Sequence, residues 1–573
     1  MMMEEEPNGK AMKLVSPHLR YIMSGIFALC CPSSAANAID TAPYLAQWLQ
    51  QPTIQIGETL VESQGLRNFY GAEGYRPIWT DAQGLTPRAT QALNVIANAG
   101  VDGLNPEIYK LSSIRALTAL PASDTDTILR NHLSLEILIS DAIMHYASDM
   151  DSGFAHHQWN TGKESTTADE QLALLQQAAA NPNIAEFLTA LAPKTQDYTA
   201  LKKVLQEYQT IASKGGWPEF VPGKTIKPGA KDPRVATLRQ ILFANGDLAA
   251  NIPAQENTYD ALTMEAVKHF QERHGLDANG IINTPTQEAL TVPVADRITQ
   301  ISMTLDRMRW MPKDIGSRYV MVNIPAYALT AISGNNRLNM NVIVGKASTK
   351  TPMFSKNITD IVFNPSWGVP TKIAVNEMLP KVRKDPDYLI KAGYTVMETR
   401  DGNSHVIDPH EVNWQSIGRG NFTYSFRQNP GDGNALGKVK FNIPDSDDIY
   451  LHDTSQHRLF ERADRSLSHG CIRLSEPKSL TEFILGNEGW PEPKIEAAYD
   501  SATSKTVHIT PLPVHLVYWT SWVDSQGRAH FSRDIYGMDK TLLAASKPNS
   551  AVTKNVTGDS KKAAALSTSR NNS

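Results

Sequence analysis

The stretch Ser468-His469-Gly470-Cys471-Ile472-Arg473 decides how the rest of this chain is interpreted. Cys471 is the only cysteine outside the N-terminal segment, which holds Cys30 and Cys31. A lone thiol beside a glycine, with histidines close by in the sequence, is a candidate nucleophile, because an imidazole can convert the thiol to the thiolate that attacks a carbonyl carbon. The stretch therefore predicts a cysteine acyl-transfer site.

The candidate base for this thiol is His452. It lies in Ile449–Thr454, which reads as a strand that ends in a turn, and side-chain alternation puts Tyr450 and His452 on the face opposite the apolar residues. An imidazole there could take the thiol proton and return it to a leaving group. His469 is only two residues before Cys471, so it cannot easily swing onto the thiol and is expected to support the loop.

The other residues of the motif have supporting roles in this interpretation. Gly470 permits close backbone approach, and the amides of Gly470 and Cys471 are candidates for an oxyanion hole. Ser468 is grouped with them as loop support. Arg473 could either anchor a substrate carboxylate or brace the loop, and the sequence leaves both roles open.

The bulk composition is that of a soluble multidomain protein. The chain has 573 residues, of which 41% are hydrophobic and 20% charged, and its formal net charge is -4. That charge removes the usual electrostatic argument for nucleic-acid binding. Once the N-terminal segment with Cys30 and Cys31 is set aside, Cys471 is the only cysteine, so we expect no internal disulfide. We expect no cofactor and no metal, and we favour a monomer.

The N-terminal segment predicts export. Basic residues precede a short apolar run, Tyr21 to Cys31, and Ala36-Asn37-Ala38 follows as a small-residue cleavage site. This pattern is typical of a secretory signal peptide, here residues 1–38, and the apolar run is shorter than the ~20 residues of a membrane span. The acidic opening leaves open whether translation begins at Met12.

The predicted fold class is multidomain α+β. Residues 39–221 read as a helical scaffold, 222–293 as a compact three-helix unit, 294–315 as a linking helix and 316–545 as a mostly β domain. Residues 546–573 are polar and are expected to be disordered. Asp149, Asp151, His156 and His157 suggest a metal site, but their spacing matches no known metal motif, and a solvated loop is the expected explanation.

Residues 372–426 interrupt the β domain. Ile373 to Lys384 and Tyr388 to Gly393 read as helices, and Gly402-Asn403 reads as a turn. An insertion between two strands near an active site suggests a lid over the substrate, although a structural decoration is the plain alternative.

Two parts of the chain resemble known families. The unit at 222–293 resembles the small three-helix peptidoglycan-binding domain, through Val267, Phe270, Gln271, Gly275, Leu276, Asp277, Gly280 and Leu290. The second resemblance is to the signature of the YkuD-type L,D-transpeptidases. It is carried by His452, a gap of fifteen residues, and then Ser-His-Gly-Cys, an apolar residue and Arg473. Asn364–Pro370, which contains Trp367, and Arg427–Gly431 also resemble that family. The long form resembles its large periplasmic, YcbB-like branch.

The resemblance implies a reaction and a location. Such enzymes use a cysteine acyl-enzyme, release D-alanine from tetrapeptide stems and form 3-3 cross-links between diaminopimelate residues. It further implies a Gram-negative periplasm, peptidoglycan stems and glycan as partners, a part in wall biosynthesis and cell shape, and acylation by carbapenems. Trp367 and Tyr450 are implied as weak candidates for substrate contact, with core packing the plainer role for Trp367.

Alternatives to cross-linking remain. Within enzymes they are an L,D-carboxypeptidase and an enzyme that attaches lipoproteins to the wall. From another class, the chain could be a catalytically idle wall-binding protein, although the complete set of His452 and Cys471 argues against that. Papain-like and NlpC-type peptidases are disfavoured, because their cysteine precedes the histidine in the chain.

Overall fold

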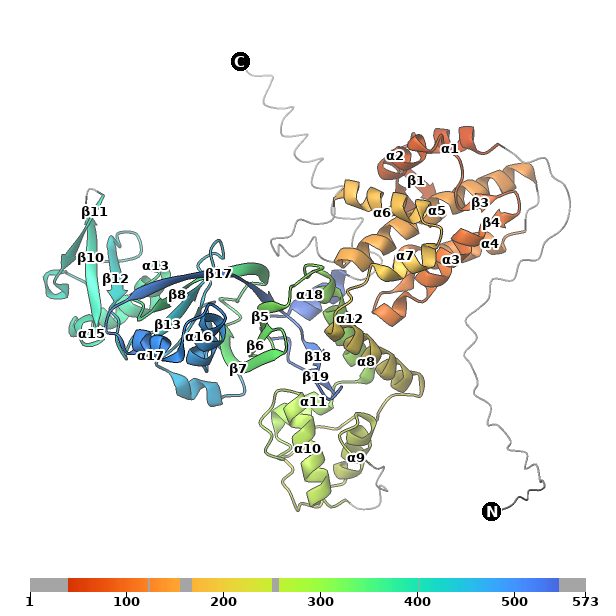
Figure 1. The fold of residues 1–573 in the computed structure, drawn as a ribbon. Coiled ribbons are helices and arrows are strands. Elements are labelled where there is room, and N and C mark those ends of the chain that lie inside the picture. Colours follow the sequence, from red (N-terminus) through yellow and green to blue (C-terminus); the bar gives the residue numbers. More distant parts are fainter. Residues whose placement is uncertain (1–39, 122–123, 155–166, 250–256, 401, 546–573) are drawn as a thin grey trace, which may run out of the picture.

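The computed structural model describes residues 40–121, 124–154, 167–249, 257–400 and 402–545 (Figure 1). The predicted signal peptide at 1–38, the tail at 546–573, and His156 and His157 lie outside these residues. Figure 1 shows a helical N-terminal body, a small helical body (α9–α11, between Arg234 and Leu290) and a β body, which meet around helices α8 (Gln196–Ser213) and α12 (Val294–Arg309). The predicted multidomain α+β class is confirmed.

The N-terminal body packs its helices around α5, whose buried residues include Leu138, Ile139 and Tyr146. Its helices are α1 (Ala42–Trp48), α2 (Gln64–Ala72), α3 (Pro87–Ala97), α4 (Leu111–Ala119), α5 (Thr125–Ser152), α6 (Ala168–Ala180) and α7 (Ile184–Ala190), whereas α8 (Gln196–Ser213) packs against α12. The sequence predicted helices alone over 39–221, but β1 (Thr53–Ile56) pairs with β2 (Thr59–Glu62), and β3 (Thr80–Asp81) with β4 (Gly84–Leu85). The first hairpin forms because its apolar residues alternate and Gly57 adopts a positive φ of 60° at the turn.

The acidic residues weighed as metal ligands have other partners. Asp149 accepts a hydrogen bond from the Tyr109 hydroxyl at 2.8 Å, and Asp151 forms an ion pair with Lys313 at 3.1 Å. These contacts tie α5 to its neighbours, so both residues have structural roles here.

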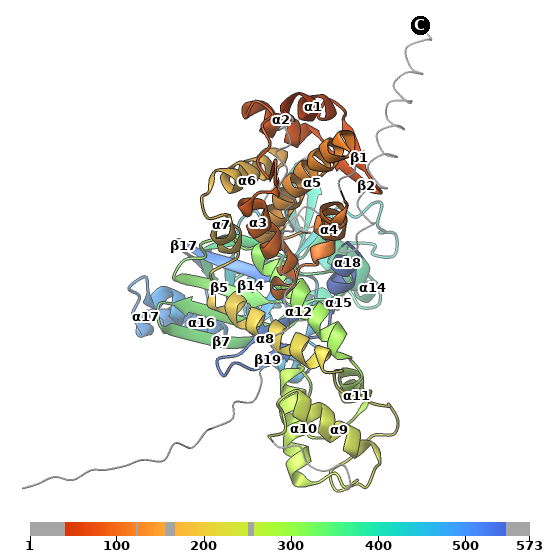
Figure 2. The same ribbon diagram turned by 90° about the vertical axis from the view of Figure 1, so that its right-hand side faces the viewer.

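The small helical body consists of α9 (Arg234–Ala244), α10 (Ala261–Arg273) and α11 (Thr284–Leu290) around a shared core. Figure 2 shows it projecting from the rest of the molecule. Gln271 is fully buried and holds the turn before α11: its amide donates to the Ile281 carbonyl at 2.9 Å, and its carbonyl accepts from Gly280 N–H at 2.8 Å. Arg273 reaches outside the body and donates to the carbonyl of Ala529 at 2.6 Å.

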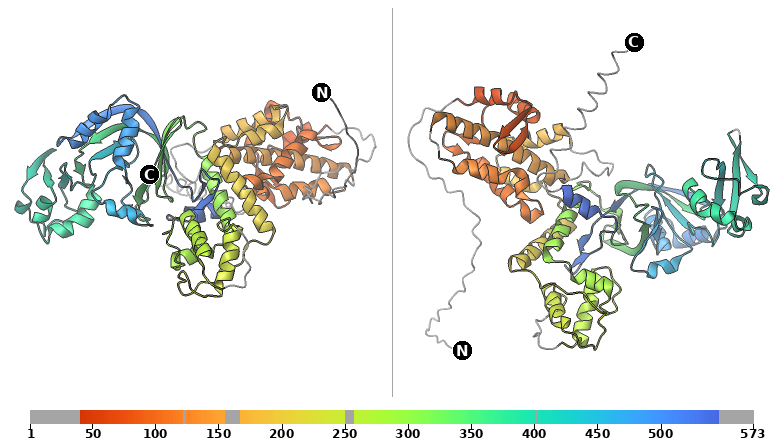
Figure 3. Two further views of the ribbon diagram at one scale, coloured as in Figure 1. Left: turned by 60° about the horizontal axis from the view of Figure 1, so that its bottom comes forward. Right: turned by 180° about the vertical axis from the view of Figure 1, so that it is seen from behind.

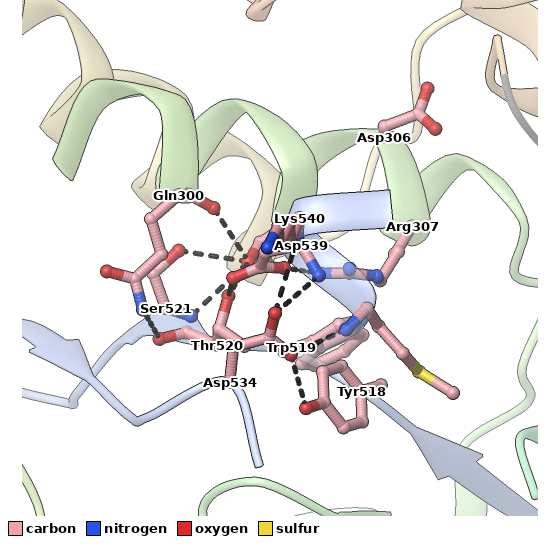
Figure 4. Close-up of polar contacts among 12 residues, drawn as sticks. Gln300, Asp306, Arg307, Tyr518, Trp519, Thr520, Ser521, Asp534, Asp539 and Lys540 are labelled. Carbon is pink, nitrogen blue, oxygen red and sulfur yellow. Dashed lines mark hydrogen bonds and ion pairs between the residues drawn. The ribbon is translucent and has the colours of Figure 1, made fainter. Parts of the chain in front are cut away.

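Helix α12 (Val294–Arg309) joins the bodies. Its buried face packs against α8 and against the strands β18 (Ser521–Val523) and β19 (Ala529–Phe531). Figure 4 shows the polar part of this junction, where Arg307 pairs with Asp539 of α18 (Met538–Ala545) at 2.5 Å and Asp539 also accepts from Thr520 at 2.7 Å. Buried charges paired in this way fix α12 against the end of the chain.

The β body is built on a nine-stranded sheet of order β15-β7-β16-β14-β13-β8-β17-β5-β6. Because β6 also pairs with β7, the strands from β7 to β6 close into a ring. Their bounds are β5 (Arg318–Asn323), β6 (Ala328–Ser333), β7 (Asn336–Gly345), β8 (Phe354–Phe363), β13 (Val439–Asn442), β14 (Leu451–His452), β15 (Ser466–Ser468), β16 (Ile472–Leu474) and β17 (Lys505–Val517). Apolar side chains of the strands, such as Val320, Val322 and Phe441, form one core together with buried residues of α16 (Pro477–Gly486) and α17 (Glu492–Asp500).

The insertion forms its own small body, whose sheet extends beyond the expected bounds of 372–426, from Trp367 to Gln428. A four-stranded sheet, β11-β10-β12-β9, packs with short helices around Trp414 and Phe426. The elements are β9 (Trp367–Gly368), α13 (Thr371–Ile373), a π-helical turn (Ala374–Met378), α14 (Leu379–Val382), α15 (Asp387–Lys391), β10 (Tyr394–Arg400), β11 (Asn403–Ile407) and β12 (Tyr424–Gln428). None of these four strands was predicted from the sequence, although β10 and β11 meet at the predicted turn Gly402-Asn403. Figures 1 and 3 place this body at the end of the β domain farthest from the N-terminal helices.

Candidate active site

The predicted base and thiol lie on neighbouring strands of the β domain. His452 ends β14, and Cys471 comes directly before β16, which pairs with β14 in parallel. The predicted strand over Ile449–Thr454 is shorter than expected, since only Leu451 and His452 pair. Cys471, His452, Tyr450 and Arg473 line one pocket of about 870 Å³, and its opposite wall comes from the insertion. Pairing between β14 and β16 thus brings together residues that are nineteen positions apart in the chain.

His452 is buried and has a defined tautomer. Its Nδ1 lies within hydrogen-bond distance of the Asp453 carbonyl, which can only accept, so Nδ1 carries the proton and the lone pair is on Nε2. Burial, and then the charges of Arg473 and Lys440, lower the pKa of His452 to about 3. The imidazole is therefore neutral at physiological pH, the state that a general base needs.

Cys471 is a free, partly exposed cysteine. Its Sγ lies 3.4 Å from the Asp448 carbonyl, to which the thiol donates. Burial raises the pKa of the thiol, and hydrogen bonds from the backbone and side chain of Tyr450, together with the charge of Lys440, oppose that rise. The resting sulfur is thus a thiol rather than a thiolate, and attack requires transfer of its proton to a base.

The loop around Cys471 is held from inside the domain. Ser468 Oγ donates to the Cys471 carbonyl at 2.6 Å and accepts from Gly470 N–H at 3.1 Å, so Ser468 supports the loop. Gly470 has a φ of 126°, which favours glycine. Because the Gly470 amide is already bonded, the amide of Cys471 is the remaining backbone candidate for an oxyanion donor in this conformation.

The back of the same loop rests on Thr351, a fully buried residue. Its hydroxyl donates to the Gly470 carbonyl at 2.6 Å and accepts from Gly345 N–H at 2.9 Å. A Cβ on Gly345 would lie 3.1 Å from the Gly470 Cα and 2.1 Å from the Thr349 carbonyl, so only glycine permits this approach. These supports were not visible in the sequence, because 119 residues separate Thr351 from Gly470.

His469 lines the pocket and contacts the insertion. Its Nε2 lies 2.5 Å from Oε1 of Glu377, in the π-helical turn Ala374–Met378. π-helical turns often occur at functional sites. His469 thus joins the loop that carries Cys471 to the insertion, through Glu377, a partner that was not predicted from the sequence.

The two aromatic candidates also line the pocket. Trp367 lies on β9, at the edge of the four-stranded sheet. The Lys440 ammonium lies 4.0 Å from the centre of the Tyr450 ring. Lys440 was another residue missed from the sequence, although the alternation of Lys438-Val439-Lys440-Phe441 places it on the polar face of its strand.

No group of three or more His, Cys, Asp or Glu side chains within the described ranges could hold a metal ion. In the same part of the chain, the helices are all too short or too polar to cross a membrane.

The comparisons with known proteins cover the three bodies. Residues 64–205 match a scaffold domain, residues 231–290 match a domain described as "Putative peptidoglycan binding domain", and residues 317–509 match the L,D-transpeptidase catalytic domain YkuD. A curated relative from Haemophilus influenzae, named "Putative L,D-transpeptidase", is 36% identical over 248 residues, which are 43% of this chain and 49% of the relative. The chain thus spans about half the length of the curated relative that it matches.

The match over residues 317–509 contains the whole pocket, including His452, Cys471 and the insertion. The pairing of β14 with β16, which brings His452 near the loop that carries Cys471, therefore lies within the matched domain. Together with the matches to a scaffold domain and to a putative peptidoglycan-binding domain, this match shows a multidomain chain that contains a YkuD L,D-transpeptidase catalytic domain.

Proposed function

We propose that this protein is a peptidoglycan L,D-transpeptidase that forms 3-3 cross-links through an acyl-enzyme on Cys471. The observation that carries the proposal is the pairing of β14 with β16, which puts a neutral imidazole and a lone thiol in one pocket of a YkuD domain. The site acts outside the cytoplasm, in the periplasm of a Gram-negative envelope, where its substrate occurs.

The first half of the reaction forms a thioester. His452 Nε2 takes the thiol proton as Cys471 Sγ attacks the carbonyl of the third residue of a tetrapeptide stem. The Cys471 amide stabilises the oxyanion. The carbon–nitrogen bond then breaks, the leaving amine receives the proton from His452, and D-alanine departs.

The second half transfers the acyl group to an amine. The side-chain amine of a second diaminopimelate attacks the thioester and gives up a proton to His452, and the carbon–sulfur bond breaks to restore the Cys471 thiol. Water in place of the amine would give a carboxypeptidase, and a lipoprotein amine would give wall attachment. We propose that the insertion at 372–426 acts as a lid, since it lines the pocket and contacts His469 through Glu377.

Product analysis tests this function. Purified protein incubated with a tetrapeptide muropeptide should yield 3-3 dimers and free D-alanine, and Cys471→Ala should yield neither while it remains folded. Tripeptide without dimer would instead identify a carboxypeptidase. Intact-mass spectrometry with a carbapenem should show one adduct per chain, and an adduct on Cys471→Ala would refute the assignment of the nucleophile.

A further inference from the structure

Lys440 lines the candidate active site, yet neither half of the reaction above gives it a task. The strand register pairs Lys440 of β13 with His452 of β14, and pairs His452 with Arg473 of β16. Cross-strand partners point to the same face of a sheet, so the three side chains form a row in which a cation flanks the imidazole on each side. All three line the pocket.

The ammonium of Lys440 has no carboxylate in direct contact among the described residues, although the charge of Asp448, which also lines the pocket, acts on it from a longer distance. Its ammonium makes no ion pair or hydrogen bond with any residue that the structure describes, and its recorded contact is the face of the Tyr450 ring. Lys438, two residues earlier, pairs with Asp432 at 2.8 Å. Lys440 is partly buried, and this desolvation lowers its pKa. An unpaired cation withdrawn from water is costly unless an anionic ligand binds it.

The other cations of the pocket are less suited to this task. Arg473 Nη1 already donates to Gln456 at 3.2 Å, which braces the guanidinium, although its buried Nε has no partner among the described atoms. The three further lysines that line the pocket, 346, 372 and 381, are exposed. Lys440 is also close enough to Cys471 for its charge to oppose the rise in the thiol pKa.

The proposed donor supplies an anion at a matching place. The terminal residue of the donor bears a carboxylate. This carboxylate is joined to the attacked carbonyl carbon through only two atoms, the α-carbon and the amide nitrogen, so it lies about 4 Å away. An ammonium beside the thiol can reach a carboxylate at that distance. A stem that continued for another residue, or that ended in an amide, would present no charge there.

We propose that Lys440 binds the terminal carboxylate of the donor stem and so makes the enzyme select a free C-terminal residue. This inference rests on the proposed function. Binding would also neutralise one of the two charges that keep the His452 pKa low. The imidazole would therefore become a stronger base only when a correct donor is in place, which couples donor recognition to proton removal from Cys471.

Two matched donors test the proposal: a stem tetrapeptide with a terminal D-alanine carboxylate and the same peptide with a terminal carboxamide. Release of the terminal residue is followed for each by mass spectrometry. For the wild-type protein we expect kcat/KM to favour the acid about ten- to a hundredfold, the range of a hydrogen bond between charged groups. Lys440→Met should bring the ratio close to one by slowing the acid donor, and Lys440→Arg should restore most of it.

Lys438→Met is the matched control, since it removes a nearby lysine that pairs outside the pocket, and it should keep the wild-type ratio. Labelling of Cys471 by iodoacetamide, a neutral reagent, reports an intact site in each variant. Lys440→Gln replaces Lys440→Met if the latter unfolds. An unchanged ratio in the charge-removing variant refutes the inference, as does a ratio that collapses in Arg473→Met but not in Lys440→Met.

The outcomes for wild-type protein separate the inference from the function on which it rests. No release from either donor refutes the proposed function. Equal release from the acid and the amide leaves that function in place and refutes only the role of Lys440.

Discussion

Thr351 offers a sharp test of how the loop that carries Cys471, residues 468–471, is supported. Its hydroxyl links two buried backbone groups, the Gly470 carbonyl at 2.6 Å and the Gly345 amide at 2.9 Å. Thr351→Val keeps the shape of the side chain and removes both hydrogen bonds. The substitution touches no residue that is proposed to contact substrate, so its effect reports the support alone.

The cost follows from burial. Thr351 is fully buried, and leaving a buried donor or acceptor without a partner costs about 1–3 kcal/mol. With two groups affected, we expect the free energy of local opening around Cys471 to fall by about 2–4 kcal/mol. Thr349→Val is the matched control. Its hydroxyl donates to the Ser468 carbonyl at 3.1 Å, but that carbonyl also accepts from Lys346 N–H at 3.0 Å.

Hydrogen exchange measured by mass spectrometry on the full chain provides the assay. Amides of the peptide that spans residues 468–473 should exchange about 30- to 1,000-fold faster in Thr351→Val, the factor that corresponds to 2–4 kcal/mol. D-alanine release should fall at least about tenfold, because the thiol loses its fixed position. The reasoning is refuted if the two threonine variants exchange alike, or if Thr351→Val exchanges like wild type.

Three further predictions concern charge and backbone shape around the pocket. Because the pKa of His452 is about 3, kcat/KM for D-alanine release should stay high well below pH 6, and an acid limb near pH 6.5 in that profile would contradict this. The same group should lower the free energy of unfolding as pH falls from about 6.5 to 3, because over that range only the unfolded chain binds a proton at His452. Glu377→Gln weakens a partly exposed contact with His469, so exchange in residues 374–378 should rise about two- to fivefold, and an unchanged rate would argue against a link to the insertion. Gly437→Ala forces a φ of 58° on alanine and places its Cβ 2.3 Å from the Asp453 carboxylate, so the free energy of unfolding of the β domain should fall by about 2–3 kcal/mol. The melting temperature should fall accordingly, and a melting temperature equal to that of the wild type would contradict the clash.

Much of the fold could be predicted from local sequence. The helices α5, α10 and α12 and the strands β5 and β7 have clear periodicity, which depends only on neighbouring residues. Prediction was weakest where strands are short or lie within an insertion. β10 and β11 were missed because their exposed residues do not alternate clearly with buried ones, so only pairing with each other and with β12 stabilises them.

The sequence by itself determined the chemical groups of the candidate site: the Cys471 thiol, a glycine beside it and a histidine at a fixed interval, with a segment upstream that matches a putative peptidoglycan-binding domain. Those features are read from neighbouring residues. The tertiary structure decided what surrounds the thiol: Thr351 behind Gly470, Glu377 against His469, and Lys440 level with His452. The physical reason is that register and packing between distant segments are set by closure of the whole sheet, and no local pattern encodes them.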